Sequence, residues 1–139
     1  MKILGVDLGL VRTGIAVSDE RQFLASPVST IEERNSDRLV EKICLIYREQ
    51  NAKAIVVGYP KNMDGSCGES AQRAESIADK LRMQLGCEVV LWDERLTTVS
   101  AIGYLNETNV RGKKRKQVVD TVAATIILQN YLDSLPSLQ

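Results

Sequence analysis

The stretch Lys2-Ile3-Leu4-Gly5-Val6-Asp7 opens the chain as a short apolar run that ends at an acid. A run of this length and composition indicates a central β-strand. Two further strand-like runs follow at residues 13–18 and 22–30, and the polar residues 19–21 separate them. This spacing predicts a three-strand antiparallel meander. Pro27 cannot donate a hydrogen bond to a neighbouring strand, so it places the third strand near an edge of the sheet.

Helices and strands alternate in the rest of the chain. Apolar residues at helical spacing predict a helix from residue 36 to about residue 51, and the continuous apolar run 54–58 predicts a strand covered on both faces. A helical stripe over 74–85 leads to a strand at 88–92, then to a short helix that Thr97 or Thr98 can cap and that ends at about Asn106, and then to a final helix. The order predicts an α/β fold of the RNase H-like plan, a mixed five-stranded sheet flanked by helices.

Length and composition suit one globular domain over residues 1–139, because 44% of the side chains are hydrophobic. The 18 basic and 18 acidic residues cancel, so any attraction to nucleic acid must be local. No apolar run is long enough for a signal peptide or a membrane span. The cysteines are odd in number and lack the close spacing of a zinc site, which favours reduced thiols and a cytoplasmic location.

Histidine is absent from the chain. Its absence excludes Ser-His triads, Cys-His pairs, histidine-ligated zinc and histidine general bases. Carboxylates, amines and hydroxyls must therefore carry any chemistry. Carboxylates without imidazole favour hard, oxygen-seeking ions such as Mg²⁺ or Mn²⁺.

Acidic residues stand where predicted strands end. Asp7 ends the first strand, and Asp93 and Glu94 follow the last one. Successive strand residues point to opposite faces, so we expect only one acid of that pair to face a common site. We expect Asp120 in the first turn of the last helix, where the helix dipole also favours a carboxylate, and Asp7 equally suits a turn cap. Asp7, Glu94 and Asp120 could together hold the metal ions of phosphodiester hydrolysis, although the spacing does not show that they meet.

A basic segment precedes the final helix, and we expect it to be a loop. Five of its six residues are cationic, namely Arg111, Lys113, Lys114, Arg115 and Lys116. Most runs of this kind are solvated loops, but phosphate binding is the sharper hypothesis. Five phosphate contacts would give a log–log salt slope of roughly −3.5 to −4.5. Arg12 and Arg95 are further candidates for contact with nucleic acid, since each follows an acidic strand end.

Taken together, four segments of the chain resemble the YqgF/RuvX family. They are Gly5-x-Asp7-x-Gly9-x-x-Arg12-x-Gly14-x-Ala16-Val17-Ser18-Asp19, Val57-Gly58-x-Pro60-x-Asn62-Met63-Asp64-Gly65, Asp93-Glu94-Arg95-Leu96-Thr97-Thr98 and Lys116-x-x-x-Asp120-x-x-Ala123-Ala124. Each segment alone is a weak signal. Four in order, spread over nearly the whole chain, are a specific match.

The resemblance implies an RNase H-like fold, similar to that of RuvC-type resolvases, and a nuclease that matures the 5′ end of pre-16S ribosomal RNA. Family members have also been proposed as Holliday junction resolvases, which would need a homodimer rather than a monomer for two symmetric nicks. On the family's motifs, the acidic site carries over to Asp7, to an acid of the pair Asp93-Glu94, here taken as Glu94, and to Asp120. The strand ending at Gly58 has no acid at its tip, where RuvC-type resolvases place one.

Two other classes of protein compete with a nuclease. An actin-like or sugar-kinase ATPase also has Asp-x-Gly after an opening strand, but it closes two lobes around a nucleotide, and no second adenosine-binding half is found here. A non-catalytic RNA-binding module for ribosome assembly would use the basic segment and leave the acids as turn caps.

Overall fold

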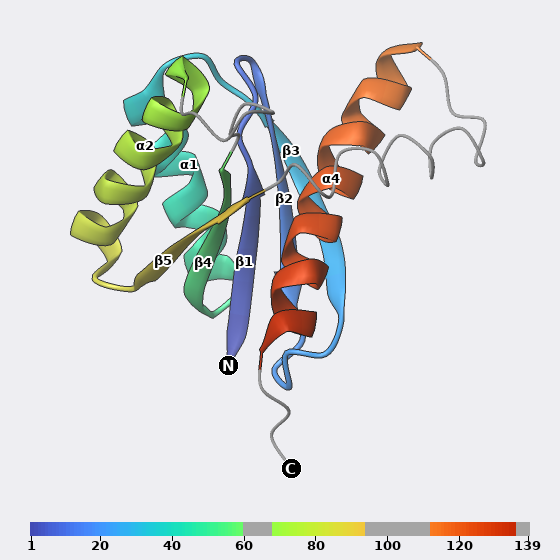
Figure 1. Ribbon diagram of the computed structural model, residues 1–139. Helices are drawn as coiled ribbons and strands as arrows, with labels where there is room; N and C mark the ends of the chain where they lie inside the picture. Colours follow the sequence, from blue (N-terminus) through green and yellow to red (C-terminus); the bar gives the residue numbers. More distant parts are fainter. Residues whose placement is uncertain (60–67, 94–111, 136–139) are drawn as a thin grey trace.

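The computed structural model describes residues 1–59, 68–93 and 112–135, and in the last helix it describes side chains from residue 121 onward. Within these residues the chain forms one five-stranded sheet with the strand order β3-β2-β1-β4-β5. Helices lie on both faces of the sheet (Figure 1). The α/β class, the mixed sheet and the position of β1 at its centre were predicted from the sequence, and they are confirmed. None of the described helices is long and apolar enough to cross a membrane.

The opening meander consists of β1 (Lys2–Asp7), β2 (Arg12–Ser18) and β3 (Ala25–Glu32). Both pairings, β1 with β2 and β2 with β3, are antiparallel. β3 is an edge strand, as Pro27 predicted.

The third strand begins at Ala25 rather than at the predicted residue 22. Asp19 explains the difference, because its carboxylate accepts hydrogen bonds from the N–H groups of Phe23 and Leu24 at 2.7 and 3.1 Å. These bonds hold residues 19–24 as a turn, and Gln22 lies in the left-handed region at φ 63°. Backbone hydrogen bonds from Leu24, with that from Phe23, also lower the pKa of Asp19.

The second half of the fold contains two crossovers that end in parallel strands. It consists of α1 (Ser36–Glu49), β4 (Ala52–Tyr59), α2 (Glu69–Leu85) and β5 (Glu88–Asp93). β4 lies parallel to β1 on one side and to β5 on the other. Asn35 caps α1 by accepting the Arg38 N–H, and Gly86 ends α2 in the left-handed conformation at φ 62°.

The two faces of the sheet carry separate cores. α1 and α2 cover one face, where Leu4 and Val6 of β1 are fully buried. α4 (Gly112–Ser134) covers the other face (Figure 1), where Ile3 and Leu128 belong to one buried cluster. Alternation along β1 thus assigns even-numbered residues to the α1/α2 face and odd-numbered residues to the α4 face.

Gly5 fixes the position of α4 along β1. A Cβ atom added at Gly5 would lie 2.8 Å from the Cβ of Leu128 and 3.2 Å from the carbonyl oxygen of Ala124. No larger residue fits without displacing the helix, so this close approach sets which residues of α4 stand over which residues of the strand.

The prediction of a loop over residues 111–116 is wrong for residues 112–116, because α4 begins at Gly112. Lysine, arginine and glutamine have high helix propensity, and residues 113–119 contain no proline and no residue typical of a helix N-cap that would delay the start. The prediction that Asp120 lies in the first turn is also wrong. Asp120 is the ninth residue of α4, counting from Gly112, which places it in the third turn.

Candidate active site at the carboxyl end of β1

Asp7 lies at the carboxyl end of the central strand and is half-buried. Ile3 and Gly5 precede it at spacings of two and contact the α4 side. Asp7 is therefore the odd-numbered residue that follows them on the α4 face of the sheet. It takes part in an interaction within the molecule, so its carboxylate is not a free group.

Glycines stand beside Asp7 in both neighbouring strands. Gly14 of β2 is its direct antiparallel partner. Gly58 of β4 comes directly after Val57, the parallel partner of Val6, so it lies level with Asp7 on the other side. Neither neighbour places a side chain next to the Asp7 carboxylate. The strands beside this acid thus carry no side chain at its level, whereas Ile3 lies on the same face within an apolar cluster.

Asp120 lies at the same height as Asp7 on the facing helix. α4 runs opposite to β1, since the last turn of α4 and the beginning of β1 lie at the same end of the molecule (Figure 1). Asp120 comes one turn before Ala124, about 6 Å along the helix, and Asp7 comes two residues after Gly5, about 6.6 Å along the strand. Gly5 lies against Ala124, and Asp7 and Asp120 are displaced from these two residues by similar distances in the same direction. The backbones of Asp7 and Asp120 are therefore at the same level. Residues 120, 124 and 128 share one face of the helix, although the structure does not describe the Asp120 side chain.

Asp93 of the pair Asp93-Glu94 is the last residue of β5. Trp92 belongs to the α4-side core, where its ring meets that of Tyr131 edge-on at 5.5 Å. Asp93 is the parallel partner of Tyr59, which is buried in the α1/α2-side core. Asp93 therefore lies on the opposite face from Asp7. Glu94 and Arg95 lie outside the described residues.

The structure describes Arg12 in full, but it does not describe the side chains of the other basic candidates. Arg12 begins β2 and is half-buried, and it shares the α4 face with Gly14 and Ala16. Lys113, Lys114, Arg115 and Lys116 occupy the first turns of α4, roughly 6 to 10 Å beyond the level of Asp120 along the helix. Their side chains, and the whole of Arg111, lie outside the part of the chain that the structure describes.

Among the side chains that the structure describes, no three acids, cysteines or histidines gather as a metal-binding group. Two of the three predicted ligands, Glu94 and Asp120, are not among these side chains. The predicted acidic site thus stays a prediction. The described part of it is Asp7, with glycines on both sides.

Arg73 is a residue at this end of the sheet that was not predicted from the sequence. It lies on α2, and its Nη1 donates a 2.9 Å hydrogen bond to the carbonyl oxygen of Gly9, just beyond Asp7. One signal was available, because Arg73 precedes the buried residues Ile77 and Leu81 at spacings of four. An arginine in line with an apolar helical stripe points inward rather than to solvent.

A family model described as "RuvX: Holliday junction resolvase" matches residues 1–134 of the chain. The chain belongs to the RuvX family. Two relatives bear the name "Putative pre-16S rRNA nuclease". The one from Shouchella clausii is 44% identical over 135 residues and the match covers 96% of this chain and 95% of the relative. The one from Halalkalibacterium halodurans is 45% identical over 135 residues, with 96% of each protein covered.

A solved structure of T. thermophilus RuvC in complex with a Holliday junction substrate is similar to the RuvX-family chain in fold. The match covers 99% of each chain with a TM-score of 0.61 and 12% sequence identity. At this identity the similarity shows the fold alone, and it confirms the RNase H-like architecture predicted from the sequence. In this RuvX-family chain, Gly58 is buried at the end of β4, where the resemblance places an acid in RuvC-type resolvases.

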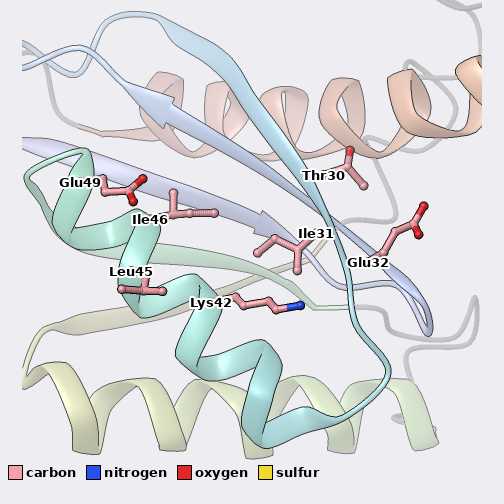
Figure 2. Close-up of a pocket in the computed structure, with 7 residues that line it drawn as sticks. All are labelled: Thr30, Ile31, Glu32, Lys42, Leu45, Ile46 and Glu49. Carbon is pink, nitrogen blue, oxygen red and sulfur yellow. The ribbon is translucent and has the colours of Figure 1, made fainter.

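A pocket of the RuvX-family chain lies away from these residues. It is formed between β3 and α1, and Figure 2 shows Ile31 beside Lys42, Leu45 and Ile46. Ile31 belongs to the core on the α1/α2 face, whereas Asp7 lies on the α4 face. The pocket is therefore not the place where the predicted acids would gather.

Proposed function

We propose that this chain is a divalent-metal-dependent nuclease that processes the 5′ end of pre-16S ribosomal RNA. Membership of the RuvX family and the names of its relatives support a nuclease of this substrate class. The observation that carries the proposal is the placement of Asp7 on the α4 face, with glycines beside it and Asp120 at its level. The free thiols of Cys44 and Cys87 suit a reducing cytoplasm.

The residues present fit a hard divalent ion. Asp7, Glu94 and Asp120 would hold Mg²⁺ or Mn²⁺ through carboxylate oxygens, since the chain contains no histidine. The strand parity seen at Trp92 and Asp93 favours Glu94 over Asp93 for the α4 face. When bound, such an ion lowers the pKa of water and stabilises charge on a phosphate oxygen.

The chain's own cations would bind and orient the nucleic acid. Arg12 lies on the same face as Asp7, so it can place a phosphate close to that carboxylate. The cations at positions 113–116 lie further along α4 from the same end of the sheet, which suits the flanking phosphates. Contacts of this kind give affinity and orientation without reading the sequence of the RNA.

The test is cleavage of a structured pre-16S leader RNA and of a four-way DNA junction, with Mg²⁺ or Mn²⁺, by the wild type and by Asp7→Asn. We expect metal-dependent cutting of the leader RNA that falls about 10²- to 10³-fold in the variant, while binding is largely retained. Cutting of the DNA junction alone would favour a resolvase. Binding by the wild type without cutting would favour an assembly module, and unchanged cutting by Asp7→Asn would end the carboxylate hypothesis.

A further inference from the structure

The turn between β1 and β2 is tightly constrained. A Cβ atom added at Gly9 would lie 2.0 Å from the carbonyl oxygen of Arg12, so only glycine fits there. On the far side of the turn, the Glu33 N–H donates a 2.8 Å hydrogen bond to the carbonyl oxygen of Val11. The turn joins the end of the strand that carries Asp7 to the beginning of the strand that carries Arg12. Its shape therefore sets where both residues stand.

Arg73 holds this turn from the α2 side. Its Nη1 donates to the carbonyl oxygen of Gly9 at 2.9 Å, across 64 positions of sequence. Its Nη2 is buried and has no hydrogen-bond partner among the residues that the structure describes. Thr13, which follows the turn at the start of β2, also has a buried hydroxyl without a partner in the described part of the chain.

Burying a guanidinium donor without a partner destabilises a protein, and buried groups of this kind are uncommon. A methionine at position 73 would fill a similar volume without that penalty. Stability alone therefore does not explain the arginine. A function that needs the Gly9 carbonyl held in place does explain it.

We propose that Arg73 is a positioning residue of the nuclease, which acts through Gly9 to fix Asp7 and Arg12 relative to each other. The inference rests on the proposed function, and it adds a residue of α2 to a site otherwise built from strand ends and α4. Arg73 acts from the α1/α2 side of the sheet and need not touch the substrate. Its effect is geometric, because a displacement of about 1 Å in a reacting group can lower a rate about 10²-fold.

The experiment compares Arg73→Met, Arg73→Lys and Arg82→Met in steady-state cleavage of the leader RNA, together with thermal unfolding. Arg82 is a matched control, since it lies on the same helix and its Nη2 donates a 2.6 Å hydrogen bond to the carbonyl oxygen of Val89. That bond holds the opposite end of the sheet, at the beginning of β5.

We expect Arg73→Met to lower kcat about 10- to 100-fold with KM nearly unchanged and with its melting temperature within a few degrees of the wild type. Arg73→Lys keeps one donor for the Gly9 carbonyl, so we expect its kcat to stay within about threefold of the wild type. Arg82→Met is expected to unfold at a lower temperature but to retain its kcat.

An unchanged kcat in Arg73→Met, while the wild type cleaves, would overturn this inference and leave the proposed function intact. A higher KM with an unchanged kcat would instead make Arg73 a substrate contact, and loss of folding would make it a structural residue. Either result also overturns the inference. A kcat for Arg73→Lys as low as that of Arg73→Met would do the same. Absence of cleavage by the wild type would reject the proposed function itself.

Discussion

The two faces of the sheet differ most at the carboxyl end of β1. On the α1/α2 face, Leu4 and Val6 are buried and Leu8 continues to pack against the same core beyond the strand. On the α4 face, Ile3 is followed by Gly5 and then by Asp7. One strand therefore supplies continuous packing on one side and a carboxylate on the other. The alternation of side chains lets β1 stabilise the fold and carry chemistry at once.

The difference extends to the strands beside β1. At the level of Asp7, Gly14 and Gly58 contribute only backbone to the α4 face. In contrast, the α1/α2 face keeps the buried side chain of Tyr59 at the end of β4. We infer that changes to the buried core of the α1/α2 face will act on stability, whereas changes at this end of the α4 face will act on binding and cleavage. Arg73 is the exception on the α1/α2 side, because it contacts the turn after Asp7 rather than the core alone.

The largest expected effect is on binding, at the start of α4. Replacement of Lys113, Lys114, Arg115 and Lys116 by glutamine should weaken RNA binding and flatten the log–log salt slope from about −4 to about −1. The measurement is affinity for the leader RNA over a series of salt concentrations. Lys80→Gln is the control, because Lys80 pairs with Asp37 at 2.8 Å on the other face. A slope that stays near −4 would show that these four cations do not contact phosphates.

A large change in stability is expected on the α1/α2 face. Ile55 of β4 is fully buried in that core. Ile55→Ala should lower the free energy of unfolding by about 2–5 kcal/mol, since it leaves a cavity among the residues around it. Urea denaturation measures the loss. The kcat per folded molecule should be retained, and a kcat that falls as steeply as the stability would contradict a functional division between the faces.

A smaller change in stability, joined to a change in activity, is expected where α4 meets β1. Gly5→Ala places a Cβ atom 2.8 Å from that of Leu128, so the helix must shift. Overpacking of this kind costs about 1–3 kcal/mol. The shift also moves Asp120 relative to Asp7, so kcat should fall in molecules that remain folded. Unfolding and cleavage measured on the same sample test both effects, and a destabilised variant with unchanged kcat would argue against the pairing of these acids.

The smallest expected effect concerns an exposed ion pair and acid stability. Lys42 donates a hydrogen bond to Glu33 and forms a 3.0 Å ion pair with it, which lowers the pKa of the Glu33 carboxyl from its usual 4.5. The contribution of this ion pair to stability is fully present above pH 4.5, and it is lost as the pH falls through the lowered pKa of Glu33 in the folded protein. Melting temperatures of the wild type and of Glu33→Gln should therefore converge towards acid pH. A difference that does not change with pH would contradict this assignment, and Asp37→Asn offers an exposed comparison.

Periodicity was enough to predict most of the fold. Runs of apolar residues located the five strands, and helical stripes located α1 and α2, because burial of a face imposes a period on the sequence. The rule that alternate strand residues face opposite sides also predicts that only one acid of the pair Asp93-Glu94 shares a face with Asp7. Tyr59 and Trp92 place Asp93 on the face opposite Asp7, and the rule stays a prediction for Glu94, which lies outside the described residues.

Two features could not be predicted from periodicity. The start of α4 was missed since a run of like charges suggests a loop, whereas the individual residues favour a helix. Arg73 was missed because its partner is a backbone carbonyl in a turn 64 positions away. No local sequence pattern shows which backbone carbonyl will accept a hydrogen bond from a distant side chain.

The most direct test of the account compares Asp93→Asn with Glu94→Gln in metal-dependent cleavage of the leader RNA. The two acids are adjacent in sequence and both changes remove one negative charge, so they differ mainly in the face of the sheet that strand alternation predicts for each residue. We expect Glu94→Gln to lose about 10²- to 10³-fold in kcat and Asp93→Asn to stay within about threefold of the wild type. Loss of cleavage in Asp93→Asn with activity retained in Glu94→Gln would contradict the assignment of the chemistry to the α4 face.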